Sequence, residues 1–120
     1  MLGRTIVTGI FVASELLVNI AKAESPDTTA DIRCFTAGIV SSTLTKDASA
    51  QHSLQMMALY FLGRLDGREI EVDLKKRFVE EAGKMTRQDV GSEDVRCGKF
   101  IQERGAFLNE LGQDLMRQVK

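Results

Sequence analysis

The chain has few of the residues on which enzymes and metal sites most often depend. Among its 120 residues are one histidine, one tyrosine, one proline and no tryptophan. A zinc site needs three or four ligands, and His52 has no cysteine or second histidine at ligand spacing. The chain also lacks a Gly-x-Ser-x-Gly elbow and any phosphate-binding or dinucleotide-binding motif. We therefore predict that the protein is not an enzyme and holds no metal ion or cofactor.

The chain also has no large excess of charge of either sign. Lysine and arginine total 16 and aspartate and glutamate 17, so the formal net charge is -1. A nucleic acid or an anionic membrane is bound through an excess of basic residues, and we expect neither partner. Four carboxylates gather between residues 66 and 73, without the spacing of a calcium-binding EF-hand and among several basic residues. We interpret this stretch, which contains Asp66, Glu69, Glu71 and Asp73, as a solvated loop with local ion pairs.

The first 23 residues have the plan of a secretory signal peptide. Arg4 precedes an apolar run over residues 6–13, and small residues follow at Ala21 and Ala23. We predict export to the periplasm with cleavage after Ala23. The mature chain would begin at Glu24, where no cysteine is available for a lipid anchor.

Glu15 complicates the membrane segment. A carboxylate in the middle of a bilayer costs about 2.5 to 3.5 kcal/mol on insertion scales, which disfavours a permanent membrane span. An uncleaved signal anchor and a core helix of a cytoplasmic protein remain the alternatives.

Beyond residue 24 the hydrophobic pattern is helical, and no run alternates as a strand would. The sequence predicts one all-α domain over residues 24–120, a small four-helix bundle. The four predicted helices cover residues 28–44, 48–65, 74–85 and 92–118.

Capping signals predict where these helices begin and end. Asp73 stands at the N-cap of the third helix, and Gly67 can close the second in a left-handed conformation. Thr86 and Ser92 could each start the last helix, and Gly91 predicts a break between them.

The last helix has a heptad pattern. Ile101, Leu108 and Leu115 recur every seven residues and define one apolar face. A row of glycines at the same spacing runs along the border of this face: Gly98, Gly105 and Gly112. Because glycine costs about 1 kcal/mol in a helix relative to alanine, we expect the row to admit another backbone closely.

The second helix is apolar nearly all round, which is typical of a central helix. One interpretation is that the other three helices cover both of its faces. The alternative is that part of it is a surface for a protein partner or a homodimer, formed by Met56, Leu59, Tyr60 and Gly63.

The two cysteines, Cys34 and Cys97, both follow the predicted cleavage site. In an oxidising compartment they are expected to form one disulfide, although two separate buried thiols are an alternative. Packed helices lie about 8 to 10 Å apart, whereas bridged cysteines need Cα atoms about 5.5 to 6 Å apart, so their neighbours must be small. The chain has such neighbours: Ala37, Gly38, Ser41 and Gly98. We expect the first and last helices to cross closely there.

The stretch Tyr60-x-x-Gly63-x-x-Asp66-Gly67 and the later Arg96-Cys97-Gly98 support two resemblances. The chain resembles a group of uncharacterised small helical periplasmic proteins of Gram-negative bacteria with two cysteines and the same motifs. It more distantly resembles the helical immunity proteins that neutralise type VI secretion amidases. The second resemblance implies that Tyr60, Gly63 and Asp66 serve in helix packing and capping, while Gly67 belongs to the longer motif of the first group.

The function expected from these patterns is noncovalent. We predict a soluble periplasmic binding or inhibitor protein that acts by protein–protein interaction. The alternatives are a holdase chaperone of acid or envelope stress and a structural envelope protein without catalytic activity.

Overall fold

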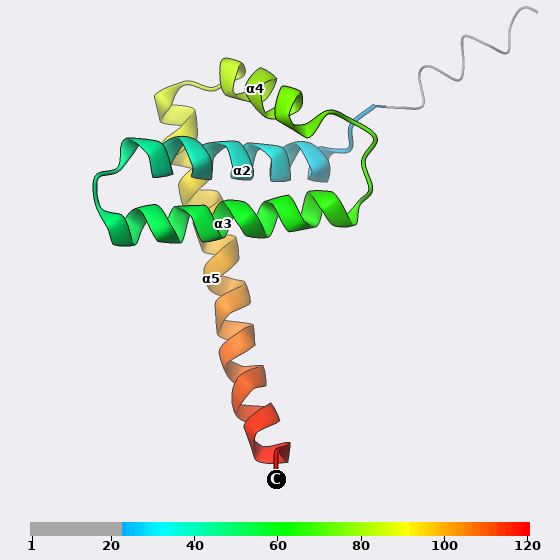
Figure 1. The fold of residues 1–120 in the computed structure, drawn as a ribbon, viewed down its shortest axis with the longest axis vertical. Coiled ribbons are helices and arrows are strands. Elements are labelled where there is room, and N and C mark those ends of the chain that lie inside the picture. Colours follow the sequence, from blue (N-terminus) through cyan, green and yellow to red (C-terminus); the bar gives the residue numbers. More distant parts are fainter. Residues whose placement is uncertain (1–22) are drawn as a thin grey trace, which may run out of the picture.

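The computed structural model describes residues 23–120, and the predicted signal peptide lies outside them except for its last residue. The described chain is all helical, as predicted, and contains no strand (Figure 1). Its four helices are α2 Pro26–Leu44, α3 Ala48–Gly67, α4 Leu74–Lys84 and α5 Arg87–Gln118.

Each helix begins at a polar N-cap. Ser25 accepts a hydrogen bond from the backbone N–H of Thr28 at 3.1 Å, and Pro26 occupies the first turn of α2, where no N–H is needed. Asp73 accepts from the N–H of Lys76 at 3.1 Å, which confirms the predicted cap of α4. Each connection between helices therefore ends at an N-cap.

Two of the predicted boundaries are wrong. Helix α5 begins after Thr86, which forms a reciprocal capping box with Asp89, and it runs through Gly91 and Ser92 without a break. The side chains of Thr86 and Asp89 accept hydrogen bonds from two free backbone N–H groups at the start of the helix. Gly91 therefore destabilises α5 only through its own low helix propensity. The left-handed residue after α3 is Glu69, with φ of 51°, and no described glycine has a positive φ.

The central helix is α2 rather than α3. Among the described helices only α2 packs against all three others, with α3 and α4 on either side and α5 crossing behind (Figure 1). The expectation that three helices enclose α3 is therefore wrong. The physical reason is that α2 carries small residues that let its neighbours approach: Ala37 is fully buried, and Gly38 faces α3.

The cysteines form the predicted bridge between the first and last described helices. Cys34 on α2 and Cys97 on α5 are fully buried, and their Cα atoms are 5.7 Å apart. The bridge belongs to a core cluster with Met57 and Phe61 of α3. Of the predicted small neighbours, Ser41 lies at this crossing and donates a hydrogen bond to Asp94 of α5.

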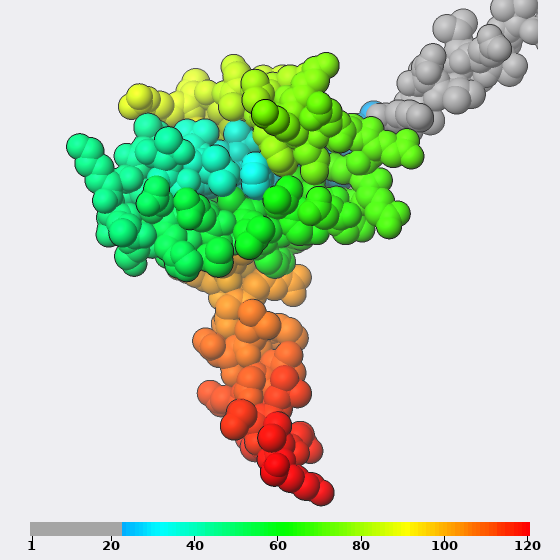
Figure 2. Space-filling view, in the orientation of Figure 1, coloured from blue at the N-terminus to red at the C-terminus, as the bar shows by residue number. Residues whose placement is uncertain are grey.

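The glycine row of α5 does not bring another backbone close, so the prediction from its spacing is wrong. A Cβ added at Gly98, Gly105 or Gly112 would have no atom of the described chain within 4 Å, beyond the glycine's own surroundings in the helix. The second half of α5 extends away from the other helices (Figure 1), and Figure 2 shows it standing alone. The close approach of backbones occurs instead between α2 and α3, at Gly38.

We predict that Gly38→Ala destabilises the protein by about 1 to 3 kcal/mol, the usual range for overpacking. The new Cβ would lie 3.2 Å from the backbone oxygen of Leu54 and 3.3 Å from the Cβ of Ala58, and neither atom can move without shifting α3. The measurement is the free energy of unfolding in urea.

Gly91→Ala is the matched control, because a Cβ there meets no atom within 4 Å. It should stabilise the protein by about 0.5 to 1 kcal/mol through helix propensity. If Gly38→Ala is as stabilising as Gly91→Ala, the packing described for α2 and α3 is contradicted.

Candidate binding surface

The outer face of α3 is apolar and exposed. Met56 is 48% exposed, Leu59 57% and Tyr60 36%, and Gly63 is also exposed. The opposite side of the same helix is buried against α2 through Met57, Ala58, Phe61 and Leu65. The four residues predicted as an interaction surface thus lie together on the exposed side, which we call the α3 face.

The α3 face is continuous with α5. The ring centroid of Tyr60 lies 6.0 Å from that of Phe100, and Phe100 lies 5.9 Å from Phe61. Arg64 places its guanidinium 5.0 Å from the centroid of Phe100, a cation–π contact that joins the two helices. Tyr60 is therefore the point where the α3 face meets the last helix.

Beyond Phe100 the apolar row of α5 is largely exposed. Leu108 is 62% exposed, Leu111 37% and Leu115 55%, and Phe107 beside them is 55% exposed. Large apolar side chains that repeat along one helix face and remain exposed are typical of an interaction surface. We call residues 102–118 the projecting half of α5.

The Tyr-x-x-Gly-x-x-Asp-Gly motif forms no common site in the structure. Tyr60 packs on the aromatic rings of Phe61 and Phe100, whereas a Cβ at Gly63 or Gly67 would meet no atom within 4 Å. The backbone carbonyl of Asp66 accepts the N–H of Glu69 at 3.1 Å, where α3 ends. The motif residues thus share one helix but have separate surroundings.

A buried carboxylate attaches α4 to α2. Glu81 of α4 is 3% exposed and accepts hydrogen bonds from Arg33 of α2 at 2.9 Å and from Arg77 at 2.8 Å. Burial alone would raise the pKa of Glu81, but the two arginines outweigh it and hold the pKa below its ordinary value. Arg77 also donates to Glu24, which precedes α2. The stacked rings of Phe35 and Phe78 complete this contact, with centroids 4.1 Å apart.

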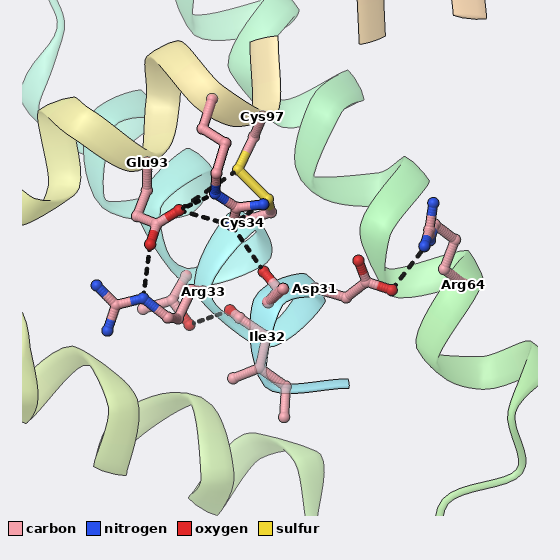
Figure 3. The surroundings of a disulfide bond; sticks show 10 residues. Asp31, Ile32, Arg33, Cys34, Arg64, Glu93 and Cys97 are labelled. Atoms are coloured by element: carbon pink, nitrogen blue, oxygen red, sulfur yellow. Dashed lines mark hydrogen bonds and ion pairs between the residues drawn. A yellow bond between two sulfur atoms is a disulfide. The ribbon is translucent and has the colours of Figure 1, made fainter. Parts of the chain in front are cut away.

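A second buried carboxylate joins α2 to α3. Asp31 is 4% exposed and pairs with Arg64 at 2.9 Å and with Arg68 at 2.6 Å. Figure 3 shows Asp31 and Arg64 meeting between the two helices. Since Arg64 also lies over Phe100, one arginine connects this ion pair to the aromatic contact beneath the α3 face.

The disulfide has charged neighbours on α5. Arg96 places Nη2 3.2 Å from the Sγ of Cys34, and Glu93 bonds Arg33 at 2.6 Å across the helix crossing (Figure 3). Cys34, Glu93 and Cys97 are the one group of three potential metal ligands in the described part of the chain. Both sulfur atoms are already bonded to each other, so we assign no metal to this group.

The remaining candidates lie apart from the candidate surface. His52 is exposed near the start of α3, and Asp73 serves as the N-cap of α4. Within residues 23–120 the carboxylates of Asp66, Glu69, Glu71 and Asp73 form no group of three close enough to share an ion. None of the described helices combines the length and the apolar composition needed to cross a membrane.

Comparisons with protein-family models, with curated proteins and with solved structures each gave no match. The candidate surface therefore rests on the geometry of this chain.

We expect Glu81→Gln to lower the free energy of unfolding at pH 7 by about 2 kcal/mol, the usual contribution of hydrogen bonds to a charged group. The folded-state pKa of Glu81 is lowered, so its contribution is fully present above the ordinary value of 4.5. The contribution is lost as the pH falls through the lowered pKa. The difference between variant and wild type, measured by urea denaturation, should therefore shrink in acid.

The exposed neighbour Glu80 provides the control. Glu80→Gln should change the free energy of unfolding by less than about 0.5 kcal/mol at either pH. A Glu81→Gln variant as stable as Glu80→Gln at pH 7 would show that the ion pairs do not hold α4 in place.

Proposed function

We propose that this protein is exported to the periplasm and acts there as a noncovalent binding or inhibitor protein, through the α3 face. The single observation that carries the proposal is the exposure of Met56, Leu59 and Tyr60 together on one side of α3. An apolar helix face of this kind gains free energy when another protein covers it.

The composition of the face supports a protein as its partner. Methionine adapts its shape to a partner, and tyrosine combines a large apolar ring with a hydroxyl group that can hydrogen-bond. Arginine and tyrosine are also among the residues enriched at the energetic centre of protein interfaces. Arg64, held by Asp31 and lying over Phe100, stands beside Tyr60 and gives the face a fixed cationic edge.

The rigid packing of α3 against α2 favours binding as well. The side of α3 that faces α2 is fully packed, and Asp31 ties the two helices together through two arginines. A face presented by a rigid helix loses little conformational entropy when a partner binds. The resemblance to immunity proteins agrees with an inhibitor role.

A periplasmic holdase of acid stress is the second candidate, and one observation favours it. Helix α4 is attached through Glu81 and Glu24, and hydrogen bonds from arginine lower the pKa of both carboxylates. Protonation in acid would remove these attachments and uncover Phe35 and Phe78. A holdase must expose apolar surface as it loosens. An acid titration that follows the exposure of apolar surface in the wild-type protein therefore tests this role.

The binding proposal predicts position-dependent cross-linking in the periplasm. A photoreactive amino acid at Leu59 should give one discrete cross-linked species, because Leu59 is the most exposed large side chain of the α3 face. The same amino acid at Lys75, exposed on α4 on the far side of α2, should give none (Figure 1). The species is identified by its mass and by peptide sequencing.

The mass distinguishes a different protein from a second copy of this chain. A species of twice the chain mass would assign the α3 face to a homodimer instead of a separate partner. Equal cross-linking from Leu59 and Lys75, or none from either, would contradict a binding role for the α3 face.

A further inference from the structure

The projecting half of α5 has an apolar face that no other described part of the chain covers. We propose that it pairs antiparallel with the same segment of a second copy of this chain. This inference does not rest on the proposed function, because it concerns α5 and is tested with residues outside the α3 face.

The spacing of the face suits a second helix. Leu108, Leu111 and Leu115 are separated by three and four residues, and Ile101 extends the row toward the disulfide. Such a row forms the seam of a two-stranded coiled coil, in which each side chain enters a hole on the facing helix. The 17 residues of the projecting half give a seam about 25 Å long.

The charges of the segment set its direction. Residues 102–110 contain Glu103, Arg104 and Glu110, with a net charge of -1, whereas residues 111–120 contain Asp114, Arg117 and Lys120, with a net charge of +1. An antiparallel pair therefore places the negative part of each copy beside the positive part of the other. The helix dipoles also oppose each other in this arrangement.

The apolar row fixes the register. When Leu108 faces Leu111 of the second copy, Arg104 faces Leu115 of the second copy and lies beside its Asp114. Symmetry forms this opposite-charge pair twice. A parallel pair would instead place the two Arg104 side chains against each other in the seam, at a cost from like charges.

The antiparallel arrangement also brings the glycine rows of the two copies close together. Gly105 and Gly112 lie along the same border of the seam, and a Cβ at either would meet no atom of its own chain within 4 Å. In the antiparallel register Gly105 lies near Gly112 of the second copy, so the two backbones can come together along that border. The second copy supplies the close neighbour that the monomer lacks.

An amphipathic helix could instead bind a membrane surface. Helices that lie on anionic bilayers carry an excess of lysine and arginine on their polar face. The projecting half and the two residues after it have three acidic and three basic side chains. This balance favours a second copy.

The test is sedimentation equilibrium of the purified protein at up to about 100 µM, with Leu108→Asp as the variant and Asn109→Asp as the matched control. Leu108 is in the seam, and Asn109 is exposed outside it, so both variants add the same charge to the same turn. We expect a wild-type dimer, a dissociation constant raised at least about tenfold by Leu108→Asp, and a change of less than about twofold for Asn109→Asp.

Charge exchange tests the direction of pairing. Arg104→Glu and Asp114→Arg should each weaken the dimer, and the double variant should regain most of the lost affinity. Circular dichroism should show all variants folded, because these side chains lie outside the core. Additive losses in the double variant would overturn the antiparallel register.

Three results would overturn the pairing itself. One is a wild-type protein that stays monomeric at the highest concentration. Another is equal dissociation constants for Leu108→Asp and Asn109→Asp. The third is a monomer that binds vesicles of phosphatidylethanolamine and phosphatidylglycerol and loses that binding with Leu108→Asp, which would assign the face to membranes. The α3 face can fail in cross-linking while the pairing holds, so the two proposals are distinguishable.

Discussion

The covalent bridge between Cys34 and Cys97 is the constraint on which the rest of the structure depends. It joins the middle of the central helix to the first third of α5, across a sequence separation of 63 residues. A bridge closing a loop of that length contributes about 4 kcal/mol in the chain-entropy model, a large share of the stability of a small domain. Because the bridge lies so early in α5, the rest of that helix extends beyond the helices that could cover it.

Buried ion pairs help the apolar core around the bridge to position the helices, while other large apolar side chains remain exposed. Glu81 and Asp31 are buried carboxylates that each bind two arginines, and together they attach α4 and α3 to α2. The exposed apolar side chains lie instead on the α3 face and the projecting half of α5, which meet at Tyr60 and Phe100. The proposed role in protein binding rests on these two exposed apolar faces.

The features that the sequence predicts well are local. Asp73 and Thr86 cap helices because a short polar side chain before an apolar repeat satisfies free backbone N–H groups whatever surrounds it. The disulfide was also predictable, since one pair of cysteines with small neighbours allows one bridge.

The features that the sequence did not predict depend on contacts between helices. The apolar α3 suggested a central helix, but Gly38 and Ala37 give α2 the closer packing. The glycine row of α5 was expected to admit another backbone closely, but the predicted helix 92–118 is longer than any other predicted helix of the chain, and its second half has no described helix beside it. In the sequence Asp31 and Glu81 resemble ordinary surface charges, because their partners Arg64 and Arg33 are far away along the chain. Gly91 did not break α5, because the capping box at Thr86 fixes the start of the helix one turn earlier.

Hydrogen–deuterium exchange, followed by mass spectrometry at low and high protein concentration, tests the central claim most directly. The disulfide holds the first part of α5 on α2, and the projecting half is covered only when it pairs with a second copy. We expect residues 87–101 to be protected equally at both concentrations, and residues 102–118 to gain protection as the concentration rises. Slow exchange in residues 102–118 that does not depend on concentration would contradict the account, because it would mean that this segment packs against its own chain.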